Sequence, residues 1–128
     1  MKGAKTVWIT GASSGIGEAL ALTYNAKGYR TILSARRSEA LESIQKKLTH
    51  PEYSYLLPLD LEQHENAEAW FHQASAFTGS IDILINNAGM GHLGTAIEME
   101  LEIERKVFEV NFWGAVALTK AVLPHMTS

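Results

Sequence analysis

The sequence contains no cysteine among its 128 residues. Disulfide bonds, cysteine-ligated zinc and a thiol nucleophile are therefore excluded. The five histidines also lack the pairing of metal ligands, because His64 and His72 lie eight residues apart and the others are isolated. No metal site is predicted.

An excess of positive charge is missing as well. The chain has 11 Lys and Arg against 14 Asp and Glu, a net charge of -3, and no basic cluster suited to nucleic acid or an anionic membrane. Residues 1–5 lead directly into an apolar run, without a long hydrophobic segment or a cleavage site before it. We therefore expect a cytoplasmic, globular domain with no nucleic-acid partner and no membrane partner.

A glycine-rich turn dominates the N-terminal part, where residues 6–17 read Thr-Val-Trp-Ile-Thr-Gly-Ala-Ser-Ser-Gly-Ile-Gly. The apolar residues before it favour a buried strand, and helix formers follow it. Gly11 is expected to take a positive φ, Gly15 to admit a pyrophosphate, and Gly17 to let the helix pack closely on the strand. The unpaired N–H groups at the helix start would then hold a phosphate. The spacing departs from the Gly-x-Gly-x-x-Gly fingerprint, so the turn alone is also compatible with a plain connection.

The rest of the chain alternates strands and helices. The expected strands lie at 7–9, 29–35, 53–59 and 81–85, and the alternation predicts a parallel sheet with helices on both faces. The first expected helix is residues 14–27, with Ile16, Leu20 and Tyr24 on one face. A second helix, capped by Ser38, would place Leu41, Ile44 and Leu48 inward. A third, capped by Asp60 with Gln63 as its capping-box partner, would bury Ala67, Trp70, Phe71, Ala74 and Phe77, and a fourth would run from about Met99 to His125.

Two sequence patterns compete in the prediction of the last helix. Apolar and acidic residues alternate strictly over 97–104, which is a strand period, yet most of these residues are strong helix formers and favour a helix. Lys120 is the only charged residue between Val110 and Leu123, so this helix is expected to be buried on two sides. One side would meet the sheet, and the other would meet either missing sequence or a second subunit, so a plain core helix and a dimer interface both stay open.

Arg36 and Arg37 stand where a dinucleotide fold that prefers NAD has a carboxylate. Two guanidinium groups suit a ribose 2′-phosphate instead, which predicts NADP(H) as the cofactor. Alternatively, both are solvated charges at a helix entrance, where Glu39 is close enough to neutralise either.

Four motifs in succession resemble those of the short-chain dehydrogenase/reductase family: Thr10-Gly11-Ala12-Ser13-Ser14-Gly15-Ile16-Gly17, Asp60-Leu61, Asn86-Asn87-Ala88-Gly89 and Asn111-Phe112-Trp113-Gly114. The resemblance covers residues 1–128 as the N-terminal, NADP-binding part of a family member. It implies a Rossmann-type α/β fold with strand order 3-2-1-4 and the later strands missing.

The resemblance also implies roles for individual residues. Ser13, Ser14 and Ile16 would line the phosphates, and Arg36 and Arg37 would bind the 2′-phosphate. Asp60 would face the adenine amino group beside Leu61, while Asn87, Ala88 and Gly89 would border the ribose and steady the fourth strand. Asn111 would be catalytic: it would break the long helix locally and position a water in a proton relay. Other interpretations are that Asp60 is only a helix cap, Asn87 a turn residue and Asn111 a partner of helix backbone.

The family's serine, tyrosine and lysine are not found. Tyr24, Tyr29, Tyr53 and Tyr55 lack a lysine at the fourth following position. The resemblance therefore implies an oxidoreductase acting on a carbonyl or alcohol, of which the 128-residue chain alone is inactive. A non-catalytic nucleotide-binding or interaction module is the alternative. The open edge beside the fourth strand favours a homo-oligomer.

Overall fold

The centre of the fold is a parallel sheet of four strands, β1 (Thr6–Thr10), β2 (Arg30–Ser34), β3 (Ser54–Leu56) and β4 (Ile83–Ile85). Their order is β3-β2-β1-β4. The structure is a computed structural model that describes residues 4–89 and 97–126. The predicted Rossmann-type α/β fold and strand order 3-2-1-4 are confirmed.

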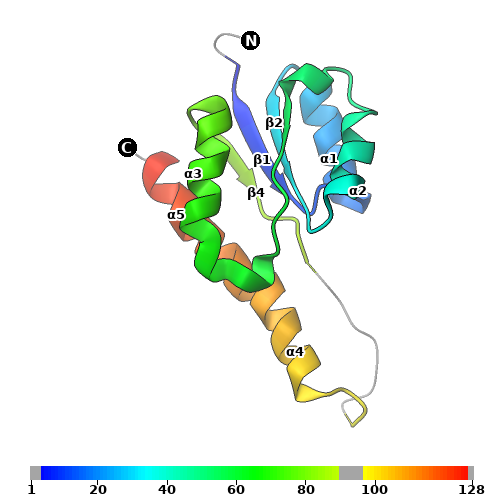
Figure 1. The fold of residues 1–128 in the computed structure, drawn as a ribbon, viewed down its shortest axis with the longest axis vertical. Helices are drawn as coiled ribbons and strands as arrows, with labels where there is room; N and C mark the ends of the chain where they lie inside the picture. The colour runs from blue at the N-terminus through cyan, green and yellow to red at the C-terminus, as the bar shows by residue number, and fades with distance from the viewer. Residues whose placement is uncertain (1–3, 90–96, 127–128) are drawn as a thin grey trace.

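Helices cover both faces of this sheet, as Figure 1 shows. Helices α1 (Gly15–Ala26) and α2 (Ser38–Gln45) lie on one face, and α3 (Ala67–Thr78) and α5 (Ala115–Met126) lie on the other. Side chains alternate along β1, so that Val7 and Ile9 join the core under α1 and α2, whereas Trp8 joins the core under α3 and α5. All three are fully buried, which explains why β1 reads as a continuous apolar run.

The buried face of α1 differs from the prediction. Gly17, Ala21 and Asn25 face the sheet, while Ile16 is 72% exposed. A side chain at Gly17 would collide with the carbonyl oxygen of Gly11, so this glycine sets how closely α1 approaches β1. The buried face of α1 is therefore the one that begins at Gly17, not the predicted face that begins at Ile16. Gly28 follows the helix with φ 92°, as expected of a C-terminal cap.

The two middle helices begin differently from their prediction. Helix α2 starts at Ser38 with the extended Arg37 as its N-cap, so Ser38 is not the cap. Asp60 does cap, since its Oδ1 accepts a hydrogen bond from the N–H of Glu62 at 3.0 Å. It begins a 3-10 helix, η2 (Leu61–Asn66), and α3 starts only at Ala67. The predicted capping box required the Asp60 side chain to accept from the N–H of Gln63, but it accepts from the N–H of Glu62 instead.

Two predictions about the apolar runs were also wrong in detail. Phe77 is 39% exposed rather than buried, and its ring stacks on Tyr55 at the sheet edge with 5.3 Å between centroids. Strand β3 is shorter than the predicted 53–59, because Pro51–Tyr53 forms a 3-10 turn and Pro58 interrupts the ladder. On either side of Pro58, the N–H of Leu57 still donates to the carbonyl of Leu33 in β2, and the N–H of Leu59 donates to the carbonyl of Ala35.

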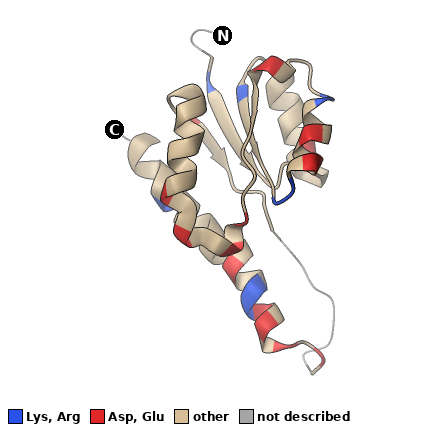
Figure 2. Ribbon diagram, in the orientation of Figure 1, with Lys and Arg blue, Asp and Glu red and all other residues tan. Residues whose placement is uncertain are grey.

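The C-terminal helix is confirmed as helical but is divided into three parts. Helix α4 (Leu101–Phe108) continues into a π-helix, η3 (Glu109–Gly114), and then into α5. Helix α4 has no buried residue and projects from the body (Figure 1), with charges of both signs along it (Figure 2).

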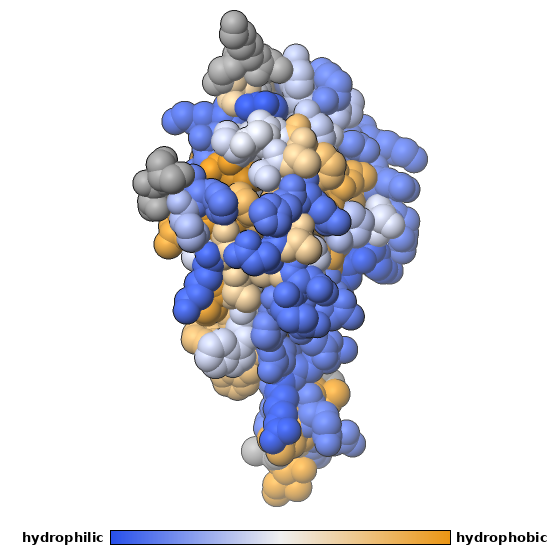
Figure 3. Space-filling model, turned by 60° about the vertical axis from the view of Figure 1, so that its left-hand side comes forward, coloured by the Kyte–Doolittle hydropathy of each residue, from blue (hydrophilic) through white to orange (hydrophobic). Residues whose placement is uncertain are grey.

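Within the described chain, one side of this helix is buried, and the side predicted to meet missing sequence or a second subunit is exposed. Leu118, Ala121 and Val122 of α5 are buried, whereas Phe112, Trp113 and Leu123 are about half exposed. The space-filling view in Figure 3 shows apolar surface at the projecting end of the molecule. Among the described helices, none combines the length and the apolar character needed to span a bilayer.

Candidate functional site

A cavity of about 250 Å³ opens at the carboxyl ends of the strands, the edge where ligands bind in open parallel sheets. Five segments that are distant in sequence line it: the glycine turn, the end of β2, the start of η2, the segment after β4, and η3. The lining residues are Gly11, Ser13, Ser14, Ser34, Ala35, Arg36, Leu59, Asp60, Leu61, Asn87, Ala88, Gly89 and Val110.

The glycine turn has the geometry expected from its sequence. Gly11 has φ 64° and Gly15 has φ 58°, both in the left-handed region. A Cβ at position 11 would lie 2.8 Å from Ala88 Cα, so the close approach of the two loops also requires glycine there. Ser14 is the N-cap of α1 but gives it no side-chain hydrogen bond. The first N–H groups of α1 thus keep no side-chain cap, as an anion site at a helix start requires.

Thr10 joins the end of β4 to the glycine turn. Its Oγ1 accepts hydrogen bonds from the N–H groups of Asn87 at 3.1 Å and Ala88 at 3.0 Å, and donates to the carbonyl of Ile85 at 3.3 Å. The Asn87 side chain donates to the carbonyl of Gly11 at 3.1 Å. These bonds fix two walls of the cavity relative to each other.

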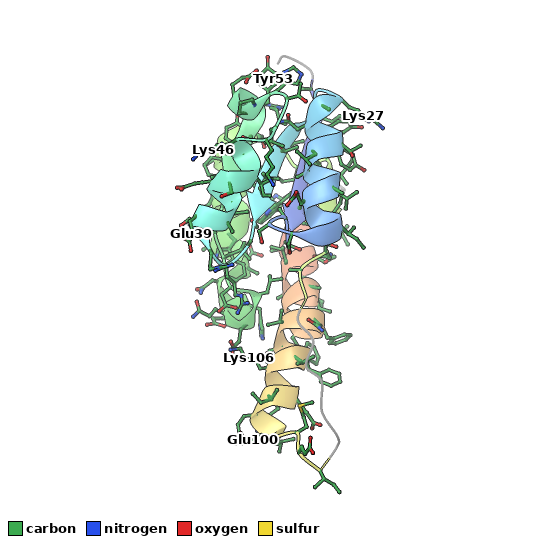
Figure 4. The ribbon with its side chains drawn as sticks, turned by 90° about the vertical axis from the view of Figure 1, so that its right-hand side faces the viewer. Lys27, Glu39, Lys46, Tyr53, Glu100 and Lys106 are labelled. Carbon is green, nitrogen blue, oxygen red and sulfur yellow. The ribbon has the colours of Figure 1, made fainter. Side chains whose placement is uncertain are left out.

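The two arginines after β2 have different positions. Arg36 lines the cavity, while Arg37 is the N-cap of α2 and does not line it. Within the described residues, neither forms an ion pair with Glu39. Figure 4 shows Glu39 and Lys46 directed away from the body on the outer side of α2. The interpretation in which Glu39 neutralises an arginine is therefore not supported.

Asp60 combines two of the interpretations made from sequence. Its carboxylate caps η2 through the N–H of Glu62 and also lines the cavity. Within the lining set it is the acidic residue, and Arg36 is the basic one. The cavity thus offers one cation and one anion at separate elements.

Asn111 lies beside the cavity, within η3. A Cβ at Gly89 would be 3.2 Å from Asn111 Oδ1, and the preceding Val110 lines the cavity. A π-turn inserts one residue into a helix and is often found at functional sites. Here the π-helix brings the Asn111 amide next to the loop that follows β4.

Close contacts hold η3 against η2. A Cβ at Gly114 would lie 2.8 Å from both Cβ and the carbonyl oxygen of Leu61. His64 Nε2 and Glu109 Oε2 are 2.6 Å apart, and Lys106 Nζ of the preceding α4 lies 3.7 Å from Glu62 Oε2. The cavity wall at Leu61 therefore depends on the packing of η3.

The structure gathers most of the predicted cofactor-binding residues. Those that line the cavity are Gly11, Ser13, Ser14, Arg36, Asp60, Leu61, Asn87, Ala88 and Gly89. Those that do not line it are Gly15, Ile16, Gly17 and Arg37. Among the described residues no group of side chains is arranged to hold a metal ion.

Several residues of the site were missed from sequence. Ser34, Ala35, Leu59 and Val110 line the cavity, and His64 was interpreted as an ordinary histidine although it pairs with Glu109. Because side chains alternate along a strand, Ser34, two positions before Arg36, was expected on the same side of the chain as Arg36, and this pattern could have identified it. No sequence signal connects His64 to a residue 45 positions away.

The sequence model of the short chain dehydrogenase family matches residues 5–128. The chain belongs to this family. A dehydrogenase/reductase SDR family protein 7-like of Anopheles gambiae is 41% identical over 130 residues, covering 95% of this chain and 40% of that protein. The Homo sapiens dehydrogenase/reductase SDR family member 7 is 42% identical over 125 residues, covering 94% of this chain and 37% of that protein. The chain thus spans about two fifths of the length of these short-chain dehydrogenase relatives.

Solved short-chain dehydrogenases share the fold. One from Streptomyces avermitilis superposes with a TM-score of 0.88 at 35% identity, covering 98% of this chain and 45% of that one. A metagenomic short-chain oxidoreductase in complex with NADP gives a TM-score of 0.89 at 29% identity, covering 95% of this chain and 56% of that one. A 3-ketoacyl-(acyl-carrier-protein) reductase from Brucella melitensis, complexed with NADH, gives 0.87 at 29% identity, covering 94% and 50%. A nicotinamide cofactor is therefore supported for this fold.

Proposed function

We propose that this chain is the NADP(H)-binding part of an oxidoreductase that transfers hydride between the nicotinamide and a carbonyl or alcohol substrate. The observation that carries the proposal is the cavity that Arg36 and Asp60 share at the carboxyl end of the sheet. Membership of the short-chain dehydrogenase family supports the class of reaction.

The preference for NADP(H) over NAD(H) rests on Arg36. Arg36 lines the cavity at the end of β2, where an NAD-preferring fold has a carboxylate. Guanidinium forms bidentate, charge-assisted hydrogen bonds with phosphate, and a carboxylate at the same place would repel it. The relatives crystallised with NADP and with NADH leave both cofactors open for the family, so the argument depends on this chain's own residue.

The described residues would hold the adenosine end of the cofactor. The glycine turn and the uncapped start of α1 would receive the phosphates, and the Asp60 carboxylate would accept a hydrogen bond from the adenine amino group. When bound, the nicotinamide supplies the hydride. Asn111, beside Gly89, would hold a water in the proton path.

Calorimetric titration of the purified chain with NADPH and NADH tests this proposal. We expect NADPH to bind more tightly by about tenfold or more, because NADH lacks the phosphate that Arg36 would bind. Equal affinity would remove the argument for NADP(H), and no binding of either would refute the cofactor site in this chain. Circular dichroism on the same sample controls for folding.

We also propose that the 128-residue chain alone does not catalyse the reaction. General acid catalysis in this family requires a tyrosine with a lysine four residues later, and no tyrosine of the sequence has one. An assay of NADPH oxidation with a panel of aldehydes and ketones is expected to give no turnover above the uncatalysed rate. Turnover by the homogeneous chain would contradict this.

The exposed apolar residues on α4, η3 and α5 support a further part of the proposal, that the protein assembles as a homo-oligomer through this surface. Phe108 is 65% exposed and Trp113 is 51% exposed. Patches of this kind on a soluble protein mark interaction sites more often than free surface.

A further inference from the structure

The π-helix η3 contacts η2 at both of its ends. Helix α4 has no buried residue, whereas Gly114 at the end of η3 is buried. At the start of η3, His64 Nε2 lies 2.6 Å from Glu109 Oε2. At its end, a Cβ at Gly114 would lie 2.8 Å from Leu61 Cβ. The two contacts together place η3 on the body of the molecule.

The contact at the start of η3 is a short hydrogen bond to a carboxylate. A carboxylate can only accept, so His64 Nε2 carries the hydrogen whether the imidazole is neutral or charged. Hydrogen bonds to a charged group are shorter and stronger than neutral ones. The neighbouring pair, Lys106 and Glu62, is longer at 3.7 Å and has both side chains about 40% exposed. An exposed pair of this kind contributes little, so the bond from His64 to Glu109 is the stronger side-chain link between η2 and the helix.

A π-helix depends on such contacts, because its hydrogen-bond pattern is rare and occurs mostly as single turns inserted in α-helices. Here it runs over Glu109–Gly114, between α4 and α5. A Cβ at Gly114 would lie 3.1 Å from the carbonyl oxygen of Glu109, so the first and last residues of the turn are adjacent. Relaxation of this turn to a regular α-helix would rotate the residues before it by about a quarter of a turn relative to α5.

Asn111 lies between the two ends that contact η2. A Cβ at Gly89 would be 3.2 Å from Asn111 Oδ1, and Val110 lines the cavity. Glu109 precedes Asn111 by two residues in the same turn. The hydrogen bond that fixes Glu109 therefore also fixes where the Asn111 amide lies relative to the loop after β4.

We propose that His64 is a positioning residue, which holds the π-turn on η2 through Glu109 and thereby sets the place of the Asn111 amide beside Gly89. The inference rests on the proposed function, in which Asn111 holds a water in the proton path. His64 is not one of the residues that line the cavity, so it acts through Glu109 and not on the cofactor.

Variants at both ends of the bond test this role. His64→Leu removes the donor, and Glu109→Ala removes the acceptor at a partly exposed helical position, which keeps the test open if His64→Leu does not fold. His64→Gln keeps an N–H donor and should restore the wild-type behaviour. His72→Leu is the matched control, because His72 is an exposed histidine of α3 that forms no ion pair among the described residues.

Proton–nitrogen NMR correlation spectra of the whole chain report the surroundings of the Asn111 amide. Its side-chain signal is assigned by its loss in Asn111→Asp, and the indole N–H of Trp113 is a second reporter in η3. We expect both signals to shift or broaden in His64→Leu and Glu109→Ala, and to return in His64→Gln. The indole signal of Trp8, which is fully buried in β1, should stay unchanged and controls for a general loss of structure.

Three results would overturn the inference. Unchanged signals of Asn111 and Trp113 in folded His64→Leu would show that η3 keeps its place without His64. The same shifts in His72→Leu would make them an unspecific effect of losing a histidine. Equal shifts in Lys106→Met would assign the positioning to the charges of α4 instead.

Calorimetry with NADPH on the same samples keeps this inference separate from the proposed function. Failure of the wild-type chain to bind NADPH would refute the cofactor site. The spectra would still decide whether His64 places the Asn111 amide, because they need no ligand.

Discussion

At the scale of single residues, Arg36 and Arg37 are a natural pair for experiment because one lines the cavity and the other caps α2. Replacing Arg36→Asp removes a guanidinium and places a carboxylate near the 2′-phosphate. We expect NADPH affinity to fall by about 1.5–3 kcal/mol, with a much smaller change for NADH. Titration calorimetry measures both.

Arg37→Asp is the matched control, since it makes the same change of charge outside the cavity. It should affect the two cofactors alike and only slightly. If Arg37→Asp were the variant that lost selectivity for NADPH, the assignment of the phosphate to Arg36 would be wrong. Equal losses of both cofactors in Arg36→Asp would instead indicate a folding defect.

Residues whose role depends on their place at a strand end were readily predicted. Gly11, Asp60 and Asn87 each follow a strand, and parallel strands bring their carboxyl ends together, so the sequence was enough to place them around one cavity. Ser34 and His64 were missed because their partners, Trp8 and Glu109, lie 26 and 45 positions away in the chain. Such contacts depend on packing between elements, which local patterns do not encode.

At the scale of elements, the close packing of η3 on η2 makes Gly114 a sensitive position. Gly114→Ala would place a methyl group 2.8 Å from Leu61 Cβ and its carbonyl oxygen. Because backbone must shift to admit it, we expect a loss of about 1–3 kcal/mol in the free energy of unfolding. Weaker NADPH binding should accompany it, since Leu61 lines the cavity. Urea denaturation and calorimetry test the two effects.

Lys120→Ala on the exposed side of α5 serves as the control and should change stability by less than about 0.5 kcal/mol. A Gly114→Ala variant as stable as wild type would show that the two segments separate easily. In that case the π-helix would not support the cavity wall.

The elements themselves were predicted better than their faces and limits. Strand and helix types followed from hydrophobic period and propensity, including the helix over the alternating residues of α4. The buried face of α1 was misjudged because spacing favoured the large Ile16, whereas packing selected the small Gly17. A π-helix does not change the hydrophobic pattern of a helix, so the residues alone did not predict the division of the last helix. The local break at Asn111 that the family resemblance implied is confirmed by η3.

At the scale of the whole molecule, the projecting α4 and η3 leave aromatic side chains half exposed, with Phe112 and Trp113 in edge contact at 4.8 Å. We expect the chain to self-associate at micromolar concentrations and Trp113→Lys to shift it toward the monomer. Burial of a large aromatic side chain contributes about 1.5–3 kcal/mol, and a lysine there would have to be desolvated. Sedimentation velocity over a concentration series measures the shift.

Phe77→Lys is the comparison variant, because Phe77 is a partly exposed aromatic residue on α3, away from this surface. It should leave association unchanged. A wild-type chain that sediments as a monomer at every concentration would contradict the oligomer proposal.

The order of strands has a consequence for how the molecule is built in time. Trp8 pairs with Ile32 in β2, 24 residues later, but with Leu84 in β4, 76 residues later. Closing the longer loop costs ~1 kcal/mol more entropy, so we expect β1, β2 and β3 to assemble before β4 docks. Pulse-labelling hydrogen exchange would contradict this order if the amides of β4 were protected as early as those of β2. Because Asn87, Ala88 and Gly89 arrive with β4, the cavity would be the last part of the molecule to take shape, and a nascent or partly unfolded chain would be unable to hold its ligand.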